Sequence, residues 1–159
     1  MERSFLLMML VGVIASPMVF VSRGLPLDGD TIENAIPITD PYGSYSGSTV
    51  GYTDDYDEAC PYPGSTAPDV VYVLEAPGAG WLDISLCNSL YDTKVYVYEF
   101  ANGFGFGNPL ACNDDAGCGY SGYQSLIESA PISIGHTYYI VVDGYGASSG
   151  DYTLDLLWV

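Results

Sequence analysis

Short β-forming runs separated by turn residues constrain the fold of this chain more than any other feature. No long stretch repeats apolar residues at helical spacing, whereas glycine (19), proline (10) and tyrosine (15) are abundant. The strongest β-forming run, Gly135–Asp143, has enough consecutive apolar residues to be a central strand. Eight or nine such runs predict an all-β protein, a jelly-roll-like sandwich of two sheets with mainly antiparallel strands.

Local pattern also gives the approximate bounds of each strand. Pro37 confines the first run to a sheet edge because proline cannot donate to a ladder. We expect 81–86 to pair antiparallel with 69–76 through the turn at Pro77 and Gly78, and 144–150 to be a hairpin loop. The predicted strands are 31–38, 42–52, 69–76, 81–86, 93–100, 110–113, 124–134 with a break at its middle, 135–143 and 151–159.

The first 24 residues predict a secretory signal peptide. Arg3 precedes a short apolar run from Phe5 to Val21, and small residues follow at Ser22 and Gly24. A retained membrane anchor is the alternative, but the run is short for a spanning helix and contains Pro17. We therefore expect a secreted or cell-surface protein without a membrane segment in its mature form. It would be a single domain, 25–159, with an extended lead-in at 25–38.

The charge is strongly negative, at a formal −17 for the whole chain. Removal of residues 1–24 would leave one of 3 basic residues, Lys94, against 19 of 20 acids, a formal net charge of −18. Nucleic acid is excluded as a partner because binding it requires a basic surface. The acidic side chains repel one another. Either bound cations neutralise this net charge, or the charge keeps the protein soluble in a salty medium that screens it.

Four cysteines in an exported chain predict two disulfides. Three pairings are possible, of which we favour Cys112–Cys118 and Cys60–Cys87. A zinc site is the alternative, but the chain has no Cys-x-x-Cys and a single histidine, His136.

The acidic turns predict a calcium site, since Ca²⁺ takes six to eight oxygen ligands from loop carboxylates and carbonyls. One acidic loop lies at 54–58, Asp92 precedes a strand, and 113–115 forms a further acidic turn. The alternative is a set of solvated turn residues. The candidate ligands are Asp54, Asp55, Asp57, Glu58, Asp92, Asn113, Asp114 and Asp115. A possible second site comprises Asp28, Asp30, Glu33 and Asn34.

Catalysis has little support in the sequence. His136 begins a strand, and no Gly-x-Ser-x-Gly elbow accompanies it. The loop and edge tyrosines are a different kind of candidate, because exposed tyrosine stacks on sugars and fills protein interfaces. They are Tyr42, Tyr45, Tyr52, Tyr56, Tyr62, Tyr120, Tyr123 and Tyr145.

Several runs together resemble the bacterial pre-peptidase C-terminal (PPC) domain over roughly 31–159. The runs that carry the resemblance are Pro68–Tyr72, Tyr91–Tyr98, Ala111–Asp115, Gly135–Gly144 and Gly150–Leu154. The resemblance implies a jelly-roll sandwich of the kind appended to secreted proteases. Related collagen-binding domains of clostridial collagenases bind calcium and a substrate polymer. We expect no attached catalytic domain in this chain, which would depart from the usual context.

We therefore expect a non-catalytic, calcium-stabilised extracellular protein with a structural or interaction role. One form of that role is self-assembly into a fibre or surface layer, in which segment 25–38 adds to the sheet of another copy. The alternative is a module that binds polysaccharide or a collagen-like polymer through its tyrosines. A small hydrolase is the third hypothesis.

Overall fold

The computed structural model describes residues 27–59, 63–100 and 108–159. Within these ranges the chain forms nine strands and one short 3-10 helix, η1 (Ile32–Asn34), which confirms the all-β prediction. The strands are β1 (Ile36–Pro37), β2 (Ser44–Ser48), β3 (Val70–Glu75), β4 (Gly80–Ser85), β5 (Thr93–Phe100), β6 (Ala111–Asn113), β7 (Leu126–Ile132), β8 (Thr137–Gly144) and β9 (Asp151–Trp158).

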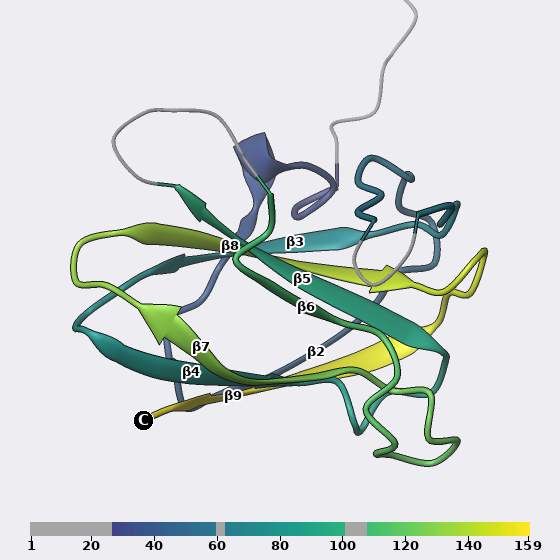
Figure 1. Cartoon of the computed structure of the whole chain (residues 1–159). Coiled ribbons are helices and arrows are strands. Elements are labelled where there is room, and N and C mark those ends of the chain that lie inside the picture. The colour runs from purple at the N-terminus through teal and green to yellow at the C-terminus, as the bar shows by residue number, and fades with distance from the viewer. Residues whose placement is uncertain (1–26, 60–62, 101–107) are drawn as a thin grey trace, which may run out of the picture.

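The strands form two sheets that pack face to face, seen as two layers in Figure 1. One sheet has the order β1-β3-β8-β5-β6 and the other the order β2-β9-β4-β7. The β1–β3 pair is parallel and the other named pairs are antiparallel. Strand β8 occupies the centre of the five-stranded sheet, as its apolar run predicts.

Strand β5 is buried on both of its faces. Val95 and Val97 point between the two sheets and belong to the main core. Tyr96 and Tyr98 point to the outer face of the five-stranded sheet, where residues 53–59 cover them. The sequence does not predict this cover, because a sandwich strand ordinarily leaves its outer face to solvent.

Two predicted connections are wrong. Strand β4 pairs with β7 and β9, not with β3, so the turn at Pro77 and Gly78 crosses from one sheet to the other. Residues 144–150 also change sheets, because β8 and β9 lie in different layers. A short Gly-containing connection suits either a hairpin or a corner. The choice depends on how the apolar faces pack across the two sheets.

The lead-in docks on its own domain. The Thr31 backbone N–H donates to Asn34 Oδ1 at 2.7 Å, which closes the short η1 turn. Strand β1 then pairs with β3, and the Ile38 N–H donates to the Val73 carbonyl at 2.8 Å. In this structure the segment therefore completes its own sheet. Residues 1–26, with the expected signal peptide, lie outside the described residues, and no helix in the described part is long and apolar enough to cross a membrane.

Candidate functional site: an acidic cluster at two turns

Asp92 occupies the turn immediately before β5. Its backbone carbonyl accepts a hydrogen bond from the Tyr145 N–H at 3.1 Å, which ties this turn to the β8–β9 connection. Residue Thr93 follows and begins the strand. The side chain of Asp92 is thereby placed at the end of the sandwich where the β6–β7 loop passes.

Asp114 and Asp115 follow the short strand β6, and a buried serine fixes them beside Asp92. Ser125 Oγ lies 2.8 Å from the Asp114 carbonyl oxygen and 2.6 Å from the Thr93 carbonyl oxygen. The Ser125 N–H also donates to Thr93 Oγ1 at 2.9 Å. One serine thus joins the residue after Asp92 to the backbone of Asp114. Neither Ser125 nor Thr93 carries a sequence signal for this role.

The three aspartates form one carboxylate cluster. Each offers an oxygen within 4.8 Å of the others, with Asp114 buried, Asp92 half-buried and Asp115 exposed. Oδ1 of Asp92 is buried and has no hydrogen-bond partner among the described residues. Burial, and then the neighbouring Asp114 and Asp115, raise the pKa of Asp92 to about 6. The cluster therefore stabilises either protons or a cation.

Two tyrosines flank the cluster. A cavity of about 390 Å³ is lined by Asp92, Asp115, Tyr123 and Tyr145. Both tyrosine side chains are exposed, at 55% and 47%. The cavity consequently combines carboxylate oxygens with aromatic faces that solvent reaches.

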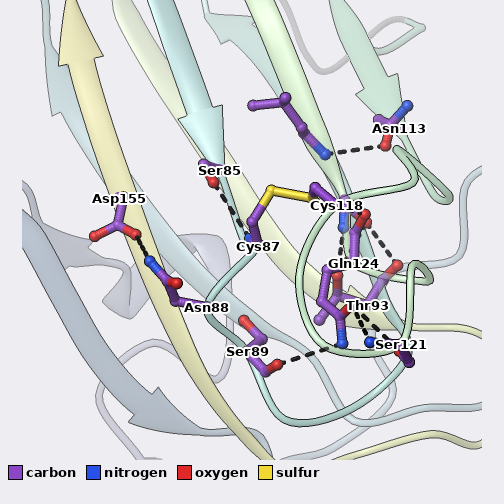
Figure 2. Close-up of a disulfide and its surroundings, with 12 residues drawn as sticks. Ser85, Cys87, Asn88, Ser89, Thr93, Asn113, Cys118, Ser121, Gln124 and Asp155 are labelled. Atoms are coloured by element: carbon purple, nitrogen blue, oxygen red, sulfur yellow. Dashed lines mark hydrogen bonds between the residues drawn. A yellow bond between two sulfur atoms is a disulfide. The ribbon is translucent and has the colours of Figure 1, made fainter.

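A disulfide joins the two sides of this site. Cys87, which follows β4, is bonded to Cys118 in the β6–β7 loop, as Figure 2 shows. Both predicted pairings, Cys60–Cys87 and Cys112–Cys118, are therefore wrong. Cys112 lies on β6 and packs on the outer face of the five-stranded sheet, away from Cys118. It is disulfide-bonded as well, and Cys60 lies outside the described residues.

Gln124 holds the same loop against the β4–β5 turn. Its side-chain NH₂ donates to the carbonyls of Ser89 and Tyr91, each at 3.3 Å, and its Oε1 accepts from Ser121. Figure 2 places Gln124 beside the disulfide, facing Ser89. The residue is almost completely buried. A buried amide that bridges two loops gives no recognisable pattern in sequence.

The predicted acidic loop 54–58 does not join the cluster. Asp57 accepts from the backbone N–H groups of Gly64 and Ser65 and pairs with Lys94 at 3.2 Å. Glu58 bonds to the Tyr98 hydroxyl, Asp55 to the Thr53 hydroxyl, and Asp54 is exposed. Asp57 and Glu58 thus pair with Lys94 and Tyr98 on the outer face of the sheet. Among the described residues, Asp92, Asp114 and Asp115 form the one cluster of three potential metal-binding side chains.

Three of the remaining candidate ligands, Asn113, Asn34 and Asp30, have structural partners. Asn113 Oδ1 accepts from the Leu126 N–H at 3.0 Å. In the possible second site, Asn34 caps η1 and Asp30 Oδ1 accepts from Thr53. Within the part of the chain that the structure describes, Asp28, Asp30 and Glu33 do not bring their carboxylates together as a cluster that could hold a metal ion.

The predicted tyrosine surface divides into two sets. Tyr45, Tyr52 and Tyr56 use their hydroxyls to bond backbone groups of the chain itself. The exposed set is Tyr42, Tyr120, Tyr123 and Tyr145, and Tyr62 lies outside the described residues. His136, the single histidine, lies 2.7 Å from Glu99 through Nδ1.

Comparison with known proteins shows the fold. No protein-family model matches the sequence, and no curated protein sequence matches it. Among solved structures, the pre-peptidase C-terminal domain of a collagenase from Bacillus anthracis is similar, with a TM-score of 0.50 and 17% sequence identity. The match covers 77% of this chain and 94% of the collagenase domain. The resemblance seen in the sequence is confirmed at the level of the fold: this chain has the β-sandwich fold of the pre-peptidase C-terminal domain.

Proposed function

We propose that this protein is a non-catalytic extracellular β-sandwich module in which one Ca²⁺ ion joins the turn before β5 to the β6–β7 loop. The observation that carries the proposal is the carboxylate cluster of Asp92, Asp114 and Asp115. Ca²⁺ prefers hard oxygen ligands in irregular loop geometry, which three aspartates at two turns provide. Backbone carbonyls and water would complete its coordination.

The charge distribution supports a cation at this position. Lys94 is the single Lys or Arg within the described ranges, and its Nζ lies against Asp57 and the Glu58 carbonyl. The other basic side chain of those ranges, His136, pairs with Glu99 and not with the cluster. A divalent ion would convert the repulsion between the three carboxylates into ligation.

The structural role follows from what the ion would connect. The cluster lies where the covalent link Cys87–Cys118 and the Gln124 bridge already join the same two loops. A disulfide and a calcium ion are both suited to a protein that works outside the cell. The ion would fix the loops and leave Tyr123 and Tyr145 exposed on a stable frame.

Thermal unfolding tests this proposal. A ligand that binds only the folded state raises the free energy of unfolding by about 2.7 kcal/mol at a concentration one hundred times its Kd. For a domain of this size we expect excess Ca²⁺ to raise Tm by roughly 5–10 °C over the EDTA-treated protein. Asp92→Asn should remove that difference. Identical melting curves in EDTA and Ca²⁺ would eliminate the calcium site.

Binding of an extracellular polymer is the second candidate role. The cavity beside the cluster favours it, because Tyr123 and Tyr145 offer stacking faces next to carboxylates. The similar solved domain belongs to a collagenase, which makes collagen a class of polymer to test. Retention on insoluble collagen or polysaccharide should fall on Tyr123→Ala. No retention of the parent protein on either material would remove this role.

Self-association is the other form of an interaction role. Because β1 pairs with β3 of its own chain, the edge strands of the two sheets are β1, β6, β2 and β7. Sedimentation with and without Ca²⁺ measures it directly. A concentration-dependent increase in size would support assembly, and a monomer under all conditions would exclude it.

A further inference from the structure

Three buried charged residues form a row across the outer face of the five-stranded sheet. Lys94 on β5 and Asp143 on β8 are direct cross-strand partners. Val70 on β3 pairs with Val142 on β8, so Asp69 lies one residue beyond that pair, on the side of Asp143. Their exposures are 1% for Lys94 and 0% for both aspartates. Burying such groups is costly unless each one is compensated.

The Lys94 amine lies between two carboxyl groups. Nζ is 3.2 Å from Asp57 Oδ1 and 4.0 Å from Asp143 Oδ2. The Glu58 carbonyl oxygen lies 2.7 Å from Nζ. Residues 57–58 therefore close over the amine, and the side chain of Asp57 itself remains 33% exposed. An amine is held beside a buried carboxyl and an accessible one.

Proton counting indicates that the Asp143 carboxyl is neutral. The Tyr96 hydroxyl lies 2.7 Å from the Tyr56 carbonyl oxygen and 3.1 Å from Asp143 Oδ2, but it has a single proton to donate. Both contacts are satisfied when Oδ2 carries a proton, donates it to Tyr96, and Tyr96 donates to Tyr56. Burial accordingly raises the pKa of Asp143 to about 7.

Donors lie around the other oxygen of the same carboxyl. The Gly144 N–H donates to Asp143 Oδ1 at 2.6 Å, and Ser65 Oγ lies 3.1 Å from that oxygen. The Ser65 hydroxyl has one proton and also lies 2.8 Å from the Gly144 carbonyl oxygen. The Gly144 N–H is therefore the fixed donor that stabilises negative charge developing on Oδ1, and the Ser65 hydroxyl adds to it when it turns from Gly144 to Oδ1. The carboxyl carbon is thus arranged to accept a nucleophile.

We propose that Lys94 and Asp143 form an intramolecular isopeptide bond. Asp57 takes one proton from the Lys94 ammonium, and Nζ attacks Cγ of the neutral Asp143 carboxyl. The C–N bond forms with the oxyanion at Oδ1, and the C–Oδ2 bond then breaks. Oδ2 leaves as water with its own proton and a second proton from Nζ. Asp57 finally releases its proton to solvent, so the net change is the loss of one water.

Asp69 is a positioning residue in this scheme. Burial raises its pKa to about 7, and its repulsion with Asp143 is mutual. Two neighbouring buried carboxyls do not both ionise, so Asp69 helps to keep Asp143 neutral. The bond would fasten β5 to β8 beneath the 53–59 loop, in the centre of the sheet.

Intact mass measures the bond directly. The reduced protein purified as the full chain should weigh about 18 Da less than its sequence requires, because one water is lost. Lys94→Met and Asp143→Ala should have their full sequence masses. Asp57→Asn should accumulate the lighter species more slowly after refolding, whereas Asp151→Asn, an exposed acid on β9, should match the parent. A parent protein at its full sequence mass would overturn the proposal.

Trypsin supplies an independent readout that does not depend on the folding of any variant. The only Lys and Arg residues are Arg3, Arg23 and Lys94, so trypsin has one site beyond residue 24. An acylated Lys94 is not cut, and the reduced, denatured parent should stay intact after Arg23. Complete cleavage at Lys94 would show that Lys94 and Asp143 form only an ion pair and no covalent bond. A cross-link mapped to Asp57 would contradict the assignment to Asp143.

The role of Asp69 has its own test. Asp69→Asn should slow the mass loss during refolding at neutral pH, and mild acid should restore the rate because it protonates Asp143 again. A merely structural residue would not show this recovery. Equal rates for parent and variant across pH would remove Asp69 from the scheme.

Discussion

Cys87 is disulfide-bonded to Cys118, which joins the turn leading to Asp92 to the loop that follows Asp115. The bond closes a loop with a sequence separation of 31 residues. It therefore restricts the unfolded chain and also limits how far the two carboxylate-bearing turns can separate. The disulfide and the acidic cluster act on the same pair of loops.

Removal of this disulfide should lower both stability and calcium affinity. We expect Cys87→Ser combined with Cys118→Ser to lose about 2–4 kcal/mol of unfolding free energy in urea. Calcium should bind more weakly, because the ion must then order the two loops itself. Unchanged affinity in a folded double variant would show that the loops are positioned without the bond.

Gly119 tests how tightly the disulfide loop is packed. Its φ is +70°, and a Cβ there would overlap the Cys87 carbonyl oxygen. Gly119→Ala should destabilise the fold by about 2–4 kcal/mol in urea unfolding. Gly117 is the matched control, since its φ is +68° and a Cβ there would meet no atom within 4 Å. Gly117→Ala should cost only about 1 kcal/mol; equal losses would contradict this packing.

The strands were predictable from sequence because their signal is local. The alternation in 93–100 gives the bounds of β5, and the apolar run near residue 140 gives the central position of β8. The partners of β4 were not predictable, because a Pro-Gly turn fits a hairpin and a corner equally well. Cysteine pairing has the same limitation, since spacing alone favours the short loop closed by Cys112 and Cys118.

The site was predictable only in part. The turns at Asp92 and at 114–115 do meet, as the resemblance to the pre-peptidase C-terminal domain implies. The 54–58 loop, the most acidic segment, instead covers the outer face of β5, where Lys94, Tyr96 and Tyr98 provide polar partners. Alternation marks those three residues as outward-facing but does not show that a loop buries them. Such long-range pairing leaves no periodic signal.

Acid should stabilise the calcium-free protein. Burial raises the pKa of Asp69 to about 7 and that of Asp92 to about 6, from a usual value near 4. A carboxyl with a raised folded-state pKa contributes stability that is complete below the unfolded value and lost as pH rises through the folded value. The unfolding free energy in EDTA should therefore fall between about pH 4 and pH 8.

The control for this pH dependence is Asp69→Asn. The variant should lose the share of the slope near pH 7 that belongs to Asp69 and keep the part near pH 6 that belongs to Asp92. Asp143, whose pKa burial also raises to about 7, contributes to the slope near pH 7 only in molecules where its carboxyl is not bonded to Lys94. Calcium added at pH 8 should restore the part of the unfolding free energy that is lost when Asp92 ionises. A parent protein whose stability in EDTA is constant or rises over this range would contradict the assignment.

Terbium luminescence should report the ion beside its tyrosines. Tb³⁺ takes the same oxygen ligands as Ca²⁺, and a nearby phenol ring sensitises its emission. Tyr123 and Tyr145 line the cavity with Asp92 and Asp115, so Tyr123→Phe should dim the emission without weakening binding. Tyr42→Phe is the control, because Tyr42 lies beside Pro77 and Trp158 at the opposite end of the sandwich. Equal dimming by both variants would place the ion elsewhere.

Calcium titration calorimetry tests the central proposal most directly. The EDTA-treated and dialysed parent protein should bind one Ca²⁺ per chain at the cluster, and Asp92→Asn and Asp114→Asn should abolish that binding. Asp54→Asn should bind as the parent does, because the exposed Asp54 lies outside the cluster. The proposal would be contradicted by a parent protein that binds no Ca²⁺, or by binding that survives loss of Asp92 and Asp114 but not of Asp54.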